Sequence, residues 1–207
     1  MRRGPRNLVT DVPGLAVGNA HDARVMSGVT VLVGEGAFTA AVDARGGGVA
    51  SRDCDALAST GTVDQVHAIV LSGGSAFGLS AATGVQGVLA ERGIGYPVRS
   101  ARVPIVPGAI LFDLLNGGDK SWGRTPPYEA LAAKATERAG HDFEIGSAGA
   151  GYGATCADLR GGLGSASAVL HDGTVVGALV AGEPPRHGPI AHRRGLWGRP
   201  VSIGGEP

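Results

Sequence analysis

The sequence lacks several features that each define a class of protein. Its 207 residues include only 2 cysteines, Cys54 and Cys156, too few for a disulfide scaffold and without metal-ligand spacing, so both are expected as reduced thiols. Basic and acidic residues balance at 18 each, so the charge gives no reason to expect nucleic acid or an anionic membrane as a partner. No apolar run approaches the roughly 18 residues of a membrane-spanning helix, and no hydrophobic signal segment follows the basic residues 1–6. These absences predict a cytoplasmic protein.

Aromatic residues and metal-ligand clusters are also scarce. Aromatics make up 4% of the chain, so the core is expected to consist of Val, Leu, Ile and Ala. His187 and His192 have no carboxylate or cysteine partners at ligand spacing, so neither a metal nor a cofactor is expected. Glycine is abundant at 37 residues, without the Gly-X-Y period of collagen, and 43% hydrophobic residues argue against a disordered chain.

Two glycine-rich segments stand out, residues 71–79 and residues 149–167. Glycine weakens a helix or strand by roughly 0.5–1 kcal/mol per position, so such density is tolerated where the backbone turns, approaches another segment or directs amides at a ligand. We therefore expect Gly73 and Gly74 to form a tight turn from strand to helix, with amides directed into a cleft. We also expect the two segments to lie close together. The alternative is that these glycines serve only close packing or flexible linkage.

The hydrophobic pattern predicts an α/β fold. Helices are expected from Ser75, near an N-cap, to Gly93, and from Pro127 to Gly140, with a short helix or turn at residues 56–60. Residues 1–181 would form a single domain, and the proline-rich residues 182–207 a tail or linker. Strands are expected at residues 8–12 and 15–18 around a Pro-Gly turn, and at 29–33, 38–43, 66–71, 98, 103–106, 165–170 and 174–181, the last two joined by an Asp172-Gly173 hairpin.

Six segments in one order resemble the DmpA/NylC family of self-processing aminopeptidases, D-amino-acid amidases and nylon-oligomer hydrolases. The resemblance covers roughly residues 8–181. The segments are Asp11-Val12-Pro13-Gly14 with Val17-Gly18, Gly28-Val29-Thr30-Val31, Val42-Asp43-Ala44-Arg45-Gly46-Gly47, Leu71-Ser72-Gly73-Gly74-Ser75-Ala76-Phe77-Gly78-Leu79, Val103-Pro104-Ile105-Val106-Pro107-Gly108-Ala109-Ile110-Leu111-Phe112-Asp113-Leu114, and Gly149-Ala150-Gly151-Tyr152-Gly153-Ala154 with Gly161-Gly162-Leu163-Gly164-Ser165-Ala166-Ser167.

This resemblance implies a layered αββα sandwich like that of N-terminal-nucleophile hydrolases. In the family a precursor cleaves itself, and a Ser or Thr at the new N-terminus of the β-chain becomes the nucleophile, with its own α-amine as the base. The nucleophile follows the segment that corresponds to residues 182–207, commonly in an Asn-Thr-Thr stretch that this sequence does not contain. The chain is therefore expected to be an α-chain whose partner is a β-chain from the same precursor.

The resemblance also implies three catalytic positions, each with a departure. Phe112 stands where several members carry tyrosine, and phenylalanine donates no hydrogen bond. Glu183 stands where an asparagine helps to hold the oxyanion, which a carboxylate repels unless it is protonated. Arg160, or Asp158 with another gap placement, stands where a catalytic lysine occurs. Substrate contacts are expected from Gly73, Gly74, Ser75, Gly151 and Tyr152. The structural alternatives are an N-cap for Ser75, a packing ring for Tyr152, a surface cation for Arg160 and an exposed loop for Glu183.

Several functions follow from these observations. The first is hydrolysis of small peptides or amides, with the isolated chain inactive and associating with a β-chain that completes its sheets or with copies of itself. The second is a truncated or degenerate homologue that binds small molecules or proteins without catalysis. The third is an acyltransferase of the same self-processing type, in which an amine replaces water. A phosphate or dinucleotide site at the Gly73-Gly74-Ser75 turn ranks last, because the G-x-G-x-x-G spacing is missing.

Overall fold

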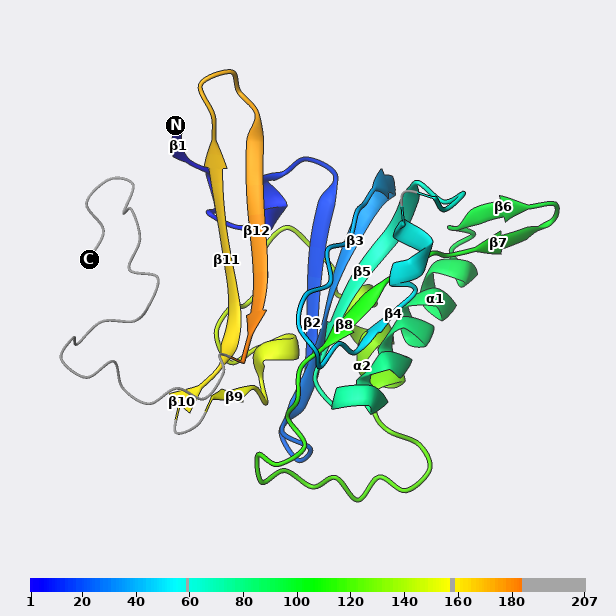
Figure 1. Ribbon diagram of the computed structural model, residues 1–207. Coiled ribbons are helices and arrows are strands. Elements are labelled where there is room, and N and C mark those ends of the chain that lie inside the picture. The colour runs from blue at the N-terminus through cyan, green and yellow to red at the C-terminus, as the bar shows by residue number, and fades with distance from the viewer. Residues whose placement is uncertain (59, 157–158, 184–207) are drawn as a thin grey trace.

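The computed structural model describes residues 1–58, 60–156 and 159–183. Figure 1 shows three layers: two helices, a five-stranded sheet, and a three-stranded sheet on the side away from the helices. The helices are α1 (Ala81–Glu91) and α2 (Tyr128–Glu137), and short 3-10 helices lie at Val9–Asp11, Cys54–Leu57, Ser75–Ser80 and Gly149–Gly151. The strands are β1 (Arg2–Arg3), β2 (Leu15–Asp22), β3 (Ser27–Thr39), β4 (Ser51–Arg52), β5 (Gln65–Ser72), β6 (Tyr96–Val98), β7 (Ala101–Val103), β8 (Gly108–Ile110), β9 (Thr155–Cys156), β10 (Leu159–Arg160), β11 (Gly162–Val169) and β12 (Val175–Gly182).

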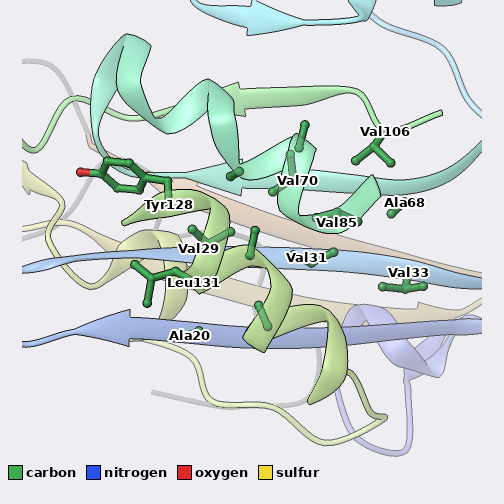
Figure 2. Close-up of a cluster of buried hydrophobic side chains, with 14 of the residues drawn as sticks. Ala20, Val29, Val31, Val33, Ala68, Val70, Val85, Val106, Tyr128 and Leu131 are labelled. Atoms are coloured by element: carbon green, nitrogen blue, oxygen red, sulfur yellow. The ribbon is translucent and has the colours of Figure 1, made fainter. Parts of the chain in front are cut away.

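The five-stranded sheet has the order β2-β3-β5-β8-β4. Strands β2, β3 and β5 are antiparallel, whereas β8 joins β5 in parallel. Helices α1 and α2 cover one face, and aliphatic side chains of the sheet pack against them to form the main core (Figure 2). Gly84 permits close contact between the two helices, because a Cβ at this position would overlap the Glu129 carbonyl. The buried core contains Ala20, Val29, Val31, Val33, Ala68, Val70, Val85, Val106, Tyr128 and Leu131.

The three-stranded sheet has the order β1-β11-β12, with both pairs antiparallel. Gly173 (φ +89°) makes the turn between β11 and β12, which confirms the hairpin expected at Asp172-Gly173. A smaller core of Leu111, Ala150 and Ala154 packs with Leu71 of β5 and Ala181 of β12, and so joins the two sheets. The described residues therefore supply a helical layer and two sheet layers.

Several elements match the sequence-based expectations. Strand β5 and helix α2 lie where expected, and α1 ends in a Schellman motif: Gly93 donates to the Ala90 carbonyl at 2.9 Å and Ile94 to the Leu89 carbonyl at 2.9 Å. Gly93 has a φ of +70°, which explains why glycine stands there.

Other expectations were wrong. Residues 8–12 form no strand; Val9–Asp11 is a 3-10 helix. The strands expected at 29–33 and 38–43 are one strand, β3, which bulges between Val33 and Phe38 and ends at Thr39. Strands were expected at 98 and 103–106, but β6 and β7 cover Tyr96–Val98 and Ala101–Val103, and residues 104–107 belong to no strand. The pairing of β6 with β7 as a hairpin was not anticipated, because Pro97 and Pro104 interrupt the strand pattern.

Of the residues described, none belongs to a helix that is both long and apolar enough to cross a membrane. Strand β12 ends at Gly182, one residue into the segment expected as a tail. The remainder of that prediction, residues 184–207, lies outside the described residues, as does Asp158.

Candidate functional site

The first glycine-rich segment makes the expected turn between β5 and the following helices. Gly74 and Ser75 both have positive φ, +86° and +53°, and a 3-10 helix runs from Ser75 into α1. The Gly73 amide donates to the Gly28 carbonyl at 2.9 Å, the Gly74 amide to Asp113 Oδ1 at 2.7 Å, and the Ser75 amide to the Leu111 carbonyl at 2.9 Å. The expectation that these amides open into a cleft was therefore wrong, because all three are bonded inside the protein.

Ser75 also does not act as a helix N-cap. Gly74 is the residue before the 3-10 helix, and no side chain of the described residues caps that helix or α1. The left-handed conformation of Ser75 is uncommon for a residue with a side chain, so the turn is held by its surroundings.

Asp113 is the residue that holds this turn. Its carboxyl is buried, and its Oδ2 accepts a hydrogen bond from Ser27 Oγ at 2.5 Å. A Cβ on Gly73 would lie 2.8 Å from Asp113 Cγ, and a Cβ on Gly153 would lie 2.7 Å from Asp113 Oδ2. The two glycine-rich segments therefore meet on the same carboxyl, as expected, and each needs glycine because a larger residue would displace it.

Asp113 itself was not among the candidate residues. The available signal was a lone carboxyl inside the apolar run at residues 109–115, followed by a glycine-rich loop. A charged group in such a run is buried only with partners, which makes it a candidate for a structural or functional centre.

Two further titratable groups lie near this carboxyl. The Tyr128 hydroxyl is fully buried and has no hydrogen-bond partner among the described residues. Burial raises the pKa of Tyr128 to about 12. The Asp113 charge adds to this increase, and the neighbouring Ser27 hydroxyl opposes it. Figure 2 shows its ring at one end of the core, with the hydroxyl directed away from the aliphatic side chains.

Lys120 supplies the nearby positive charge. Its Nζ donates to the Val25 carbonyl and, at 3.0 Å, to Asn116 Oδ1. Asn116 Nδ2 in turn donates to the carbonyls of Met26 and Gly153, at 2.6 and 2.9 Å. Burial lowers the pKa of Lys120, and the Asp113 carboxyl opposes that change. These bonds fix the second glycine-rich segment beside Asp113.

Two of the three expected catalytic positions, Phe112 and Glu183, lie on the solvent-exposed side of the Asp113 carboxyl. The Phe112 amide donates to Glu183 Oε2 at 2.7 Å, which joins the loop after β8 to the end of β12. Burial raises the pKa of Glu183; the hydrogen bond from Phe112 opposes this effect and the Asp113 charge adds to it. Ser75 lies nearby, because its amide binds Leu111, the residue before Phe112.

Exposed aromatic rings lie on the two segments that form this side. Phe112 is 46% exposed and Phe77 is 50% exposed. Phe77 packs edge-to-face on Trp122 at 5.7 Å, and Trp122 packs in the same way on Tyr128 at 5.8 Å. An apolar surface with one carboxyl of raised pKa therefore borders the Ser75 turn.

The remaining candidates lie elsewhere. Arg160 is exposed on β10, where its backbone pairs with Thr155 of β9, and its side chain makes no hydrogen bond or ion pair with the described part of the chain. Gly151 serves packing, since a Cβ there would lie 2.8 Å from the Gly162 Cα. The Tyr152 ring stacks on His21 at 4.1 Å and 7°. Within residues 1–58, 60–156 and 159–183, no three His, Cys, Asp or Glu side chains gather as metal ligands.

The sequence matches known proteins over most of its length. The family model described as Peptidase family S58 matches residues 7–200. An uncharacterized aminopeptidase of Mycobacterium tuberculosis is 42% identical over 186 residues, covering 84% of this chain and 52% of the relative. A 6-aminohexanoate-oligomer endohydrolase of Kocuria sp. is 38% identical over 154 residues, covering 73% of this chain and 39% of the relative. The chain spans about half the length, or less, of these curated relatives.

Solved structures share the fold. A Burkholderia sp. β-aminopeptidase has a TM-score of 0.66 at 23% identity, covering 88% of this chain and 54% of that one. The L-aminopeptidase D-Ala-esterase/amidase of Ochrobactrum anthropi, described as a variant of the Ntn hydrolase fold, has a TM-score of 0.62 at 20% identity, covering 86% and 53%. These similarities confirm the layered fold expected of N-terminal-nucleophile hydrolases. With the match over residues 7–200, they establish that the chain belongs to peptidase family S58, the DmpA/NylC family.

Proposed function

We propose that this chain is the α-part of a self-processing amide hydrolase that cleaves small peptides or amides. The observation that carries the proposal is that hydrogen bonds join the Ser75 turn to Leu111, and the neighbouring Phe112 to Glu183, beside the buried Asp113 carboxyl. Membership in peptidase family S58 and the names of its relatives, aminopeptidase and oligomer endohydrolase, support the same reaction class. A cytoplasmic location stays a prediction.

The sheet edge beside this surface supports a β-chain as partner. Among the described strands β12 is the terminal strand of its sheet, and its outward side chains Val176, Ala178 and Val180 are exposed. A long edge strand with an exposed apolar face is normally covered by another segment. A β-chain that covers β12 would also bring its first residue toward Glu183, which directly follows that strand.

The reaction would then use groups from both parts. The terminal hydroxyl of the β-chain attacks the amide carbonyl, its proton passes to the terminal amine, and the leaving amine departs with a proton as the acyl ester forms. Water hydrolyses that ester and restores the hydroxyl. Glu183 in its neutral form donates a hydrogen bond to the carbonyl oxygen, a role that the raised pKa of its carboxyl favours.

Expression of the complete reading frame tests this proposal. Intact mass should give two fragments, the second beginning with Ser or Thr, and the processed protein should hydrolyse amino-acid p-nitroanilides. The isolated chain Met1–Pro207 should be inactive, because Met1 offers no hydroxyl. A single unprocessed species without turnover, or turnover by the isolated chain, would contradict it. Adding a free amine and analysing the products distinguishes hydrolysis from acyl transfer.

A second candidate is a binding protein without catalysis. Two observations favour it: Phe112 has no hydroxyl, and Glu183 accepts a hydrogen bond from the Phe112 amide, which favours the ionised carboxylate. In that case the processed or unprocessed protein binds small amides, as measured by calorimetry, and releases them unchanged.

A further inference from the structure

The β6–β7 hairpin presents an apolar face to solvent. Its register pairs Tyr96 with Val103 and Val98 with Ala101, so these four side chains lie on one face of the two-stranded ribbon. Tyr96, Val98 and Val103 are 52%, 48% and 47% exposed. Figure 1 shows the hairpin extending away from the rest of the molecule, beyond the helical layer.

An isolated two-stranded ribbon is only marginally stable in water. In the described part of the chain no third strand pairs with β6 or β7. The base of the ribbon is nevertheless fixed by the Schellman motif that ends α1 at Gly93. It is also fixed by the close packing of Gly95 against Val103, where an added Cβ would lie 2.7 Å from the Val103 backbone. The hairpin is therefore held out from the body with an apolar face that another surface must cover.

A groove with a largely apolar lining lies between α1 and α2. Its volume is about 490 Å³. Gly87 opens it, because no atom of the described residues lies within 4 Å of where its Cβ would be. Glu91 and Glu129 are its acidic lining residues, and most of the remaining lining is small or apolar: Gly84, Gly87, Val88, Pro126, Pro127, Ala130 and Ala133.

The charges of the two surfaces are complementary. The hairpin carries Arg99 at its tip and Arg102 on its second strand, and the groove carries Glu91 and Glu129. None of these four side chains forms an ion pair with the residues that the structure describes. Unpaired opposite charges around two apolar surfaces are typical of the rim of a protein interface.

We propose that the β6–β7 hairpin of one copy of this chain lies in the α1–α2 groove of a second copy. The hairpin and the groove adjoin each other, because α1 ends at Glu91 and β6 begins at Tyr96. A two-fold axis near this junction lets each copy give one hairpin and receive one, so the contact closes as a dimer. This pairing leaves β12 free for a β-chain and does not depend on the proposed hydrolysis.

Sedimentation of the chain Met1–Pro207 tests the contact. The wild type should dimerise, and the double variant Tyr96→Ser/Val98→Ser should dissociate with a constant raised by at least ~10-fold. Gly87→Leu should weaken the dimer similarly by filling the groove, while its thermal midpoint stays unchanged or rises because leucine favours a helix. Val176→Ser, which alters an exposed valine of β12, is the matched control and should leave the dimer intact.

A charge exchange makes the test specific. Arg99→Glu/Arg102→Glu and Glu91→Arg/Glu129→Arg should each be monomeric alone, and should form a heterodimer when mixed, since each hairpin then meets a groove of opposite charge. A wild type that stays monomeric at about 100 µM, where even a weak complex is populated, overturns the proposal. So does a dimer that only Val176→Ser weakens, or one that neither hairpin variant changes.

Discussion

The carboxyl of Asp113 accepts the amide hydrogen of Gly74 at 2.7 Å, and this bond joins the turn after β5 to the loop after β8. The second oxygen of the same carboxyl binds Ser27 at the start of β3. Three segments of the chain are therefore fixed around one buried group, and the surface that carries Ser75, Phe112 and Glu183 rests on it.

Removal of the Asp113 carboxyl should strongly destabilise the protein. In Asp113→Ala the Gly74 amide and the Ser27 hydroxyl are left buried without partners, so the free energy of unfolding should fall by roughly 3–5 kcal/mol. Asp113→Asn keeps an acceptor oxygen and should cost about 1–2 kcal/mol. Urea denaturation measures both. Asp43→Ala, which removes an exposed ion pair with Arg45, is the control and should change stability by less than ~1 kcal/mol. Equal costs for all three variants would contradict this role.

Alanine should be poorly tolerated on either side of that carboxyl. In Gly73→Ala and in Gly153→Ala the new methyl group overlaps Asp113, so each variant should lose about 1–3 kcal/mol of unfolding free energy. Gly47→Ala is the control, because its methyl group meets nothing within 4 Å. Its stability should stay within about 0.5 kcal/mol of the wild type. A thermal melt that ranks Gly47→Ala as the most damaging of the three would contradict the packing argument.

Local pattern was sufficient to predict much of the fold. The apolar run of β5, the helical spacing of α1 with Gly93 after it, and the Asp172-Gly173 hairpin each depend on residues close in sequence. The wrong expectations had nonlocal causes. Residues 8–12 resemble a strand, but the Val9 amide donates to Ser165 of β11 and Thr10 to the His141 carbonyl, and these contacts hold a 3-10 turn.

The site was predicted less completely. The sequence indicated that the two glycine-rich segments meet, and they do so at Gly73 and Gly153. The sequence did not indicate that Asp113 lies between the two segments and accepts the hydrogen bond of the Gly74 amide. That hydrogen bond depends on the parallel pairing of β8 with β5. Gly151 and Tyr152 share the glycine-rich context, yet one packs against β11 and the other against His21. Composition does not distinguish these uses of a glycine-rich segment.

The buried hydroxyl of Tyr128 should reduce stability in the wild type. Tyr128→Phe removes a polar group that has no partner in the described structure, so the free energy of unfolding should rise by about 1 kcal/mol. The native pKa is about 12 and the ordinary value is 10.0, so the native state holds the proton more tightly and stability falls as pH rises from 10 toward 12. That loss should be smaller in Tyr128→Phe. Tyr96→Phe, at an exposed hydroxyl, is the control, and a less stable Tyr128→Phe would indicate an additional partner for the hydroxyl.

The contribution of Glu183 to stability should change with pH in the opposite direction to that of most carboxyls. Its pKa is raised by burial, so the native state binds the proton more tightly than the unfolded state. The stabilisation is complete below the ordinary pKa of 4.5 and is lost as pH rises through the raised native value. Glu183→Gln keeps an oxygen for the Phe112 amide and does not titrate, so the wild type should lose stability relative to this variant as pH increases. Urea denaturation across this range measures the difference, and Glu144→Gln, at an exposed carboxyl, is the control.

The same substitution tests the catalytic role proposed for Glu183. If neutral Glu183 donates to the carbonyl oxygen, the activity of the processed protein should decline at high pH, and Glu183→Gln should remove that decline because an amide donates at every pH. Glu183→Ala should lose activity at all pH values, by about 10²–10³-fold in kcat for a lost oxyanion donor. Equal pH–rate profiles for the wild type and Glu183→Gln would exclude this role. The carboxyl would then serve only to hold the Phe112 amide, and a hydrolase would need its oxyanion donor from the β-chain.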